Sequence, residues 1–438
     1  YTIFFNQITQ TDFLFKDVDF DVLSYLIEEA HHNGLEVHPW IWTFRVKSPS
    51  YGDPILSKYT NLTAVKENPL PTDREPLFLS PSAPQARELI AKLLKFLASN
   101  YDIDGLLLDY IRYDETINED VLSKKYFRKD YLEKYGKEPP WNIPKNEPIF
   151  TEWQLWRENQ VTTAVELIKK EVNSVKPNIP IGAAVFRTEG EGRLLKMQDW
   201  RLWDSNLLIK YICPMLYTDN PQDLTEWLNS ETDKETRSDY LYVSLGAHKF
   251  ATPDDLYSQI GTLQKRYVTG FNIFAMTHFK KETFNDLIKG VFRKPAILPH
   301  TNPLNSVKVL LSDTTLWLSQ TNRDFEKEKK DKLSLVIAKI NKINNSINIQ
   351  DRNVDYVKVK TDIEDLIIFI KNFDPFNQFY STFLNDISDN IEYALKIMKI
   401  YTREEESKNK KFTSSLPPIP ILDETKPLPY APVIYANM

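Results

Sequence analysis

The sequence predicts an α/β protein whose main part is a (βα)8 TIM barrel. Three observations indicate this fold. Continuous apolar runs alternate with helical patterns as far as about residue 276, and this alternation is typical of a parallel sheet covered by helices. Where no insertion intervenes, the runs recur at intervals of about thirty residues. Only seven runs are present, which a doubly wound sheet could also carry. A closed barrel needs eight strands, so we expect its first strand upstream of residue 1.

The apolar runs and helical patterns set the expected elements in order. Two long gaps, 43–84 and 114–150, are expected to be loops at the carboxyl ends of strands, where such barrels build their sites. Strands are expected over residues 2–6, 35–42, 103–110, 179–186, 209–217, 240–247 and 270–277. Helices are expected over residues 19–34, 83–100, 151–175 and 254–267.

The character of the chain changes after the barrel, which we assign to residues 1–295. Residues 296–412 carry charged helical patterns and predict a small helical extension. Residues 413–438 are too rich in proline for a helix or a central strand, so an extended tail is expected. The helices and the tail together are suited to docking on a protein partner.

Composition excludes several classes of function. A net charge of -6 gives no support to nucleic-acid binding, and no run of eighteen apolar residues exists, so an integral membrane protein is not expected. Cys213 is the single cysteine, and the histidines show no metal-ligand spacing, so we expect neither a metal nor another cofactor. The chain opens without Met inside an apolar stretch, which indicates a processed or incomplete N-terminus and leaves room for a signal peptide.

The segment "LLLDYIRY" contains the leading candidate for a functional residue. Asp109 ends a buried apolar strand, where a charge is costly unless it is paired or functional. Alternatively, Asp109 and Arg112 could form a structural ion pair that fastens a loop, because structural ion pairs also perturb acids. In the catalytic interpretation, Tyr110 and Arg112 shape the site. Nearby arginine would favour the ionised form of Asp109, which suits a nucleophile or base better than a proton donor.

Other polar and aromatic residues follow the expected strands. Carboxylates can serve as acid and base in glycoside cleavage, while aromatic rings stack on sugar faces. Several of them could instead have a structural role. His38 could be a packing histidine, the two tryptophans could form a barrel layer, and Glu189 could be a solvated loop residue. The candidates beside Asp109 are, for catalysis, Asp219 and Glu189 and, for substrate binding, His38, Trp40, Trp42, Arg45, Tyr110, Arg112, Tyr217 and His278.

Four phrases resemble the glycosyl-hydrolase-like family 10 proteins, which are bacterial (βα)8 barrels regarded as glycosidases. They are "LEVHPWIWTFRV", "DGLLLDYIRYD", "DWRLW" and "YICPMLYTDN", in that order, within residues 1–290. The resemblance implies that Asp109 is the family's acid after the fourth strand and that His38, Trp40 and Arg45 lie on the rim. Asp219 is inferred as a second acid and as the proton donor, with Glu189 in reserve as the second acid. Two departures are Asp114, where the family has proline, and "FRTEGEG", where it has a small-residue turn.

The family resemblance implies a glycoside hydrolase that acts on a cell-wall polysaccharide or exopolysaccharide. The alternative is a barrel that has lost catalysis and is retained as a carbohydrate-binding or structural subunit, because fold alone does not determine function. Release of new reducing ends from a glycan separates the two. A secreted, periplasmic or envelope-associated location is expected, as is common in the family.

Overall fold

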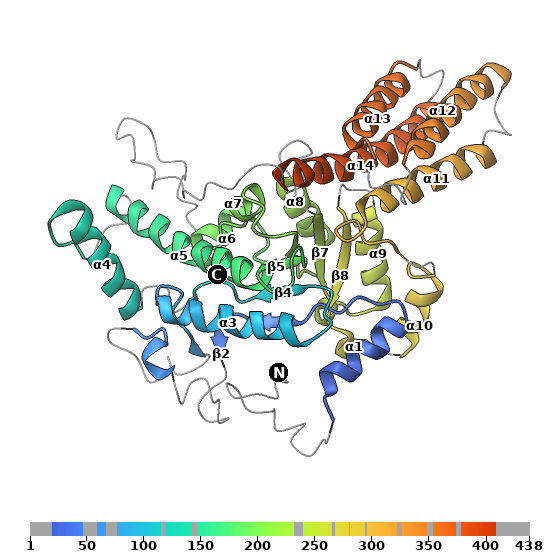
Figure 1. Ribbon diagram of the computed structural model, residues 1–438. Coiled ribbons are helices and arrows are strands. Elements are labelled where there is room, and N and C mark those ends of the chain that lie inside the picture. Colours follow the sequence, from blue (N-terminus) through green and yellow to red (C-terminus); the bar gives the residue numbers. More distant parts are fainter. Residues whose placement is uncertain are drawn as a thin grey trace.

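A computed structural model shows the arrangement of the chain (Figure 1). The expected strand at 2–6 and the expected tail at 413–438 lie outside the residues that the structure describes. These residues are 20–46, 59–66, 77–114, 120–141, 147–231, 240–264, 268–279, 281–293, 296–321, 326–347, 354–373 and 378–408.

The centre of the molecule is a six-stranded sheet in the order β1-β4-β5-β6-β7-β8, and all five pairings are parallel. Each strand lies within a range predicted from the sequence, so the α/β alternation is confirmed for these six. Their unbroken apolar character follows from burial on both faces. The strands are β1 (Trp40–Trp42), β4 (Leu106–Asp109), β5 (Ile181–Val185), β6 (Tyr211–Pro214), β7 (Tyr240–Gly246) and β8 (Gly270–Phe274).

The sheet curls into a half-barrel. Trp40 lies on one edge strand and Phe274 ends the other, yet their ring centroids are 5.6 Å apart. The two edges therefore approach each other at their carboxyl ends. Because the strands are parallel, the loops that follow them gather at this same end, which we call the rim.

A short antiparallel ribbon, β2 (Arg45–Val46) with β3 (Leu77–Phe78), lies in the loop after β1. The chain between β1 and β2 stays hydrogen-bonded to the chain leaving β4: Thr43 N–H donates to the Asp109 carbonyl at 2.8 Å, and Phe44 N–H to the Tyr110 carbonyl at 3.3 Å. The two chain segments run side by side past the rim. As a result, the side chains that follow β1 and β4 meet.

Helices cover the sheet and pack through apolar stripes. In α3, which begins at Pro84, the residues Ala86, Leu89, Ile90 and Leu94 are buried at helical spacing. The helices and single 3-10 turns of this part are α1 (Val22–His32), η3 (Thr60–Leu62), α3 (Pro84–Asn100), α4 (Val121–Tyr135), α5 (Pro148–Asn173), α6 (Glu189–Lys196), α7 (Trp200–Ser205), α8 (Pro221–Glu231), η4 (Ala247–Lys249), α9 (Pro253–Gln264), η5 (Met276–His278) and α10 (Lys281–Lys289).

Four further helices pack together beside the sheet (Figure 1): α11 (Pro303–Thr321), α12 (Lys327–Ser346), α13 (Tyr356–Lys371) and α14 (Gln378–Lys408). Their apolar side chains form one cluster with Tyr211, Cys213 and Tyr240 of the sheet. Tyr211 and Tyr240 are the first residues of β6 and β7, so the helices cover the amino-terminal ends of the strands, away from the rim. Arg403 of α14 also donates to the carbonyls of Asp204 at 2.8 Å and Ser205 at 2.6 Å.

Candidate functional site

Asp109 is the last residue of β4, and its carboxylate is buried at the rim, with 7% of the residue exposed. Trp40 Nε1 donates a hydrogen bond to Oδ2 at 2.9 Å, and the Tyr110 backbone N–H donates to Oδ1 at 2.6 Å. Trp42 lies opposite Asp109 in the parallel β1–β4 pair, so Trp40 and Trp42 share its face of the sheet. The structure thus brings together three of the residues predicted to form the site.

Tyr110 connects Asp109 to two arginines. Its φ of +49° lies in the left-handed region, which is strained for a bulky residue and is found most often at functional sites. Arg45 Nη1 donates to the Tyr110 hydroxyl at 2.5 Å. The guanidinium carbons of Arg45 and Arg112 lie 4.7 Å and 4.8 Å from the Tyr110 ring centroid, within cation–π distance. Arg112 therefore contacts the tyrosine ring, rather than forming the simple ion pair considered as the structural alternative.

Burial raises the pKa of Asp109. It outweighs the hydrogen bonds from Tyr110 and Trp40 and the positive charges of Arg112 and Arg45, all of which lower the pKa. The expected effect of Arg112 is present, because its positive charge lowers the pKa, but removing the carboxylate from water raises the pKa by more. Asp109 is consequently suited to holding and releasing a proton.

A group of aromatic rings surrounds this carboxylate on the rim. Trp40 is 43% exposed and Phe274 is 36% exposed, and their ring centroids lie 5.6 Å apart, so the two exposed rings are neighbours. Tyr217 stacks on Phe274 at 5.7 Å, with 16° between the ring planes. Burial and the nearby Asp109 charge raise the pKa of the Tyr217 phenol. Trp40 and Phe274 thus offer flat surfaces of the kind that suit a sugar ring.

His278 lies at the margin of this aromatic group. It is exposed in η5, and its ring lies 5.6 Å from that of His248, which contacts Tyr217 at 5.5 Å. His278 lines a surface pocket, and neither Asp109 nor another carboxylate belongs to the described lining of that pocket. Its lining consists of Ala247, Phe250, Ala251, Thr252, Pro253, Leu256, His278, Phe279 and Thr283.

His38 does not belong to the rim, although the sequence placed it there. It precedes β1, and its Nδ1 is 2.7 Å from the hydroxyl of Tyr211, the first residue of β6. Its ring also packs over Gly105, just before β4. Because the strands are parallel, residues that precede them gather at the end of the sheet opposite Asp109. These contacts fit the packing interpretation of His38 better than a role in binding substrate at the rim.

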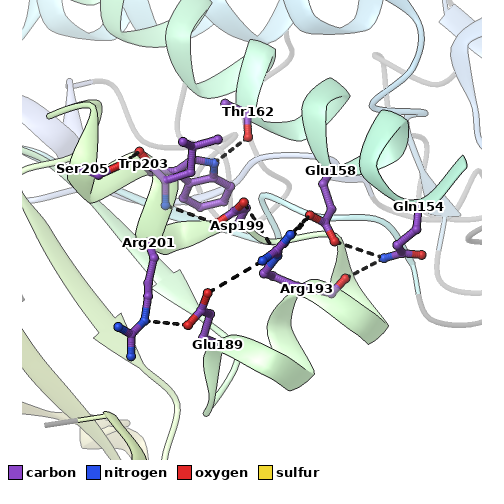
Figure 2. Close-up of polar contacts among 10 residues, drawn as sticks. Gln154, Glu158, Thr162, Glu189, Arg193, Asp199, Arg201, Trp203 and Ser205 are labelled. Carbon is purple, nitrogen blue, oxygen red and sulfur yellow. Dashed lines mark hydrogen bonds and ion pairs between the residues drawn. The ribbon is translucent and has the colours of Figure 1, made fainter. Parts of the chain in front are cut away.

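The two acids proposed to work with Asp109 lie in different settings. Asp219 is exposed on the loop between β6 and α8. Glu189 begins α6 and lies between Arg201, at 2.6 Å, and Arg193, at 3.9 Å, as Figure 2 shows. Among the described residues, no hydrogen bond or ion pair joins either acid to Asp109. Glu189 is held by two arginines in a polar network between helices, which favours a structural role for it.

The same network contains a buried acid that sequence reasoning missed. Glu158 of α5 is 5% exposed, and Arg193 donates to its Oε2 from Nη2 at 2.9 Å and from Nε at 3.1 Å (Figure 2). Burial raises the pKa of Glu158 to about 7, against the lowering effect of Arg193, while Asp199 adds to the rise. Nothing in the sequence around residue 158 distinguishes it from a solvated helix residue.

Replacing Glu158 should change how stability depends on pH. The native state keeps a proton on Glu158 that the unfolded chain has released above pH 4.5, so the unfolding free energy falls as pH rises from 4.5 to about 7. Glu158→Gln should remove this component, which amounts to about 3 kcal/mol across the window. Urea unfolding at intervals between pH 4.5 and 7.5 measures the difference between the two proteins. Parallel profiles would contradict the prediction.

Two rim residues outside the predicted set are Phe274 and His248. The rule that selected Asp109 also selects His248, which follows the expected strand at 240–247, but His248 was not chosen as a site residue. Phe274 ends β8 and was read only as part of the apolar strand run "GFNIFAMT", so the same rule could have found it. Glu36, His300 and Tyr211, described below, gave no signal because they are far apart in sequence.

A curled parallel sheet with a buried carboxylate and exposed aromatic rings at its rim defines an α/β protein with a candidate site at the carboxyl ends of its strands. The family model described as "Glycosyl hydrolase-like 10" matches residues 6–249, more than half of the chain, and the chain belongs to this family. The resemblance seen in the sequence is thereby confirmed.

Two relatives of this chain are described as glycosyl hydrolases. The chain is 24% identical over 327 residues to glycosyl hydrolase YngK of Bacillus subtilis, covering 65% of this chain and 59% of YngK. It is 23% identical over 264 residues to glycosyl hydrolase DigH of Escherichia coli K12, covering 54% of this chain and 56% of DigH. The chain thus spans less than two thirds of the length of either relative.

Among solved structures, the glycoside hydrolase domain of PgaB (BpsB) from Bordetella bronchiseptica is similar. Its TM-score is 0.47 at 15% identity, and the match covers 61% of this chain and 77% of that domain. Separately, none of the helices in the described part of the chain is both long and apolar enough to cross a membrane.

Proposed function

We propose that this protein is a glycoside hydrolase that cleaves a polysaccharide by carboxylate acid–base chemistry at the rim. The observation that carries the proposal is Asp109, a buried carboxylate at a strand end, held by Trp40 and Tyr110 beside exposed aromatic rings. Membership in a glycosyl-hydrolase-like family supports it.

The surroundings of Asp109 suggest how it works. With its pKa raised by burial, Asp109 can protonate the oxygen of a leaving sugar, and a second carboxylate must then attack or activate water. Asp219 is proposed for this second role, because it follows Tyr217 on the loop after β6 and is exposed to solvent. This assignment reverses the roles expected from the sequence, where Asp219 was the donor.

Two unused donors support ligand binding at the rim. Trp42 Nε1 and Arg112 Nε are both buried and have no hydrogen-bond partner among the described residues. Buried donors normally have partners, so these two are suited to a group that arrives with the substrate. Sugar hydroxyls are acceptors of the required kind, and Trp40 supplies a neighbouring ring face for stacking.

A second candidate function is carbohydrate binding without cleavage. It is favoured by the segment "FRTEGEG", where the family has a small-residue turn, and by the added C-terminal helices. In that case the aromatic rim would hold a glycan, and the C-terminal helices would attach the protein to a partner. We propose an envelope or extracellular location for both functions, since the glycans in question are found there.

Product release distinguishes hydrolysis from binding. The purified full chain is incubated with a panel of bacterial cell-wall glycans and exopolysaccharides, and new reducing ends are measured against heat-denatured protein. We expect one class of glycan to be cleaved at a rate that scales with protein concentration. If glycans bind and quench Trp fluorescence but release no reducing ends, the binding function replaces the hydrolytic one.

A further inference from the structure

We propose that Glu36, His38 and His300 form a binding site for a divalent transition metal ion, with Zn²⁺ the best match to the ligands. The site lies at the amino-terminal ends of the strands, opposite the rim, and is independent of the proposed hydrolysis. Glu36 and His38 belong to the segment before β1, and His300 belongs to the segment before α11. Two imidazoles and a carboxylate are a frequent three-ligand set for zinc, with water as the fourth ligand.

The ligand atoms are close enough to share one ion. Glu36 Oε2 lies 2.9 Å from His38 Nε2 and 3.4 Å from His300 Nε2, and the three atoms all lie within 4.8 Å of one another. Zn–N and Zn–O bonds of about 2.1 Å in a tetrahedron place ligand atoms about 3.4 Å apart. The observed separations reach this geometry with small rotations of the rings.

Hydrogen bonding to Tyr211 permits a form of His38 whose Nε2 is free to bind a cation. The Tyr211 hydroxyl can donate its one hydrogen to the Leu106 carbonyl at 3.3 Å, in which case it accepts from His38 Nδ1 at 2.7 Å. A neutral His38 then directs the lone pair of Nε2 at the Glu36 carboxylate. Two lone pairs at 2.9 Å repel unless a cation lies between them, and either a proton or a metal ion can fill that place.

His300 supplies an independent sign of a missing ligand. Only 7% of it is exposed, and its Nε2 has no hydrogen-bond partner among the described residues although it faces Glu36. Its Nδ1 lies 2.7 Å from the Tyr242 hydroxyl. Each histidine thus has a tyrosine on the nitrogen turned away from the centre, as metal-bound histidines have a partner on their second nitrogen.

An ion can reach this site from solvent, and Glu36 supplies one negative charge to it. The side chains of Glu36 and His38 remain 23% and 16% exposed, so the cluster has an opening to solvent. The nearby Lys210 is paired with Glu404 of α14. A bound ion would join the start of the sheet to the start of the C-terminal helices.

Metal content of the full chain tests the proposal. The protein, free of any histidine tag, is stripped with a chelator, dialysed against Zn²⁺ and then against metal-free buffer, and its zinc is measured by mass spectrometry. We expect about one Zn²⁺ per chain, a higher melting temperature with zinc, and loss of binding as the pH falls through the histidine range. Co²⁺ in place of Zn²⁺ should give the visible absorption of a four-coordinate site.

Matched variants locate the ion. Glu36→Gln and His300→Gln should each reduce bound zinc at least tenfold, whereas His31→Gln should leave it unchanged. His31 is a suitable control because it also contacts a carboxylate, Asp104, at 2.8 Å, but outside this cluster. If a variant does not fold, the stoichiometry and Co²⁺ spectrum of the unmodified chain still decide. A folded, unmodified chain that retains no zinc overturns the proposal, as does zinc that survives both substitutions.

Discussion

Asp109→Asn should abolish glycan cleavage, reducing turnover by about a thousandfold or more, which corresponds to about 4 kcal/mol of activation free energy. The amide keeps the size of the side chain but cannot give up or accept the proton that cleavage requires. One of its two polar atoms becomes a donor facing either Trp40 Nε1 or the Tyr110 N–H, so a stability loss of about 1–3 kcal/mol is expected as well. Steady-state kinetics on the cleaved glycan and urea unfolding measure the two effects.

Asp120→Asn is the matched control for this variant. Asp120 is also a buried carboxylate that accepts backbone N–H groups, from Leu122 at 2.9 Å and Ser123 at 3.1 Å, but it caps α4. Its substitution should lower stability and leave the turnover of the folded fraction near the original value. If folded Asp109→Asn protein keeps full activity, Asp109 is not the catalytic acid. If both variants lose activity only in proportion to unfolding, Asp109 is structural.

Gly182→Ala should be the most destabilising small substitution in the sheet, at about 3 kcal/mol. Gly182 lies in β5 beside Tyr211 in the register, and a Cβ there would lie 2.0 Å from Tyr211 Cε2 and 2.2 Å from Cζ. The Tyr211 ring cannot move away easily, because it is 5% exposed and its hydroxyl contacts His38 and the Leu106 carbonyl. Chemical unfolding compared with the unmodified chain measures the loss.

Gly190→Ala provides the comparison. Gly190 lies in α6, and no atom lies within 4 Å of a Cβ built there. Since alanine favours a helix over glycine by up to about 1 kcal/mol, this variant should be as stable as the unmodified chain or slightly more stable. Equal stability of the two alanine variants would show that the strands at Gly182 adjust without cost.

The sequence predicted the strands and the rim for a clear physical reason. Strands buried on both faces must be apolar throughout, so their limits are visible, and the residue after each run falls at the carboxyl end. This reasoning found Asp109, Trp40 and Tyr217 together. It placed His38 on the rim only because the apolar run began too early, at residue 35, whereas β1 begins at Trp40.

What the sequence could not predict depends on distance between segments and on burial. To predict that the pKa of Asp109 is raised, one must know how deeply the carboxylate is buried, because burial outweighs the charge of Arg112. The cluster of Glu36, His38 and His300 joins residues more than 260 positions apart, without a local motif. Similarly, Glu158 and Arg193 meet only because α5 and α6 pack together.

The shared apolar cluster between the sheet and the C-terminal helices makes the two parts one cooperative unit. The side chains of Tyr211, Cys213 and Tyr240 pack against apolar side chains of α11–α14. The Tyr393 hydroxyl of α14 also donates a hydrogen bond to the Thr269 carbonyl at 3.0 Å. A chain that ended after residue 295 would expose the amino-terminal ends of these strands to water. The change in residue pattern at residue 295 therefore marks a boundary in the sequence, while the apolar packing that stabilises the fold continues across it.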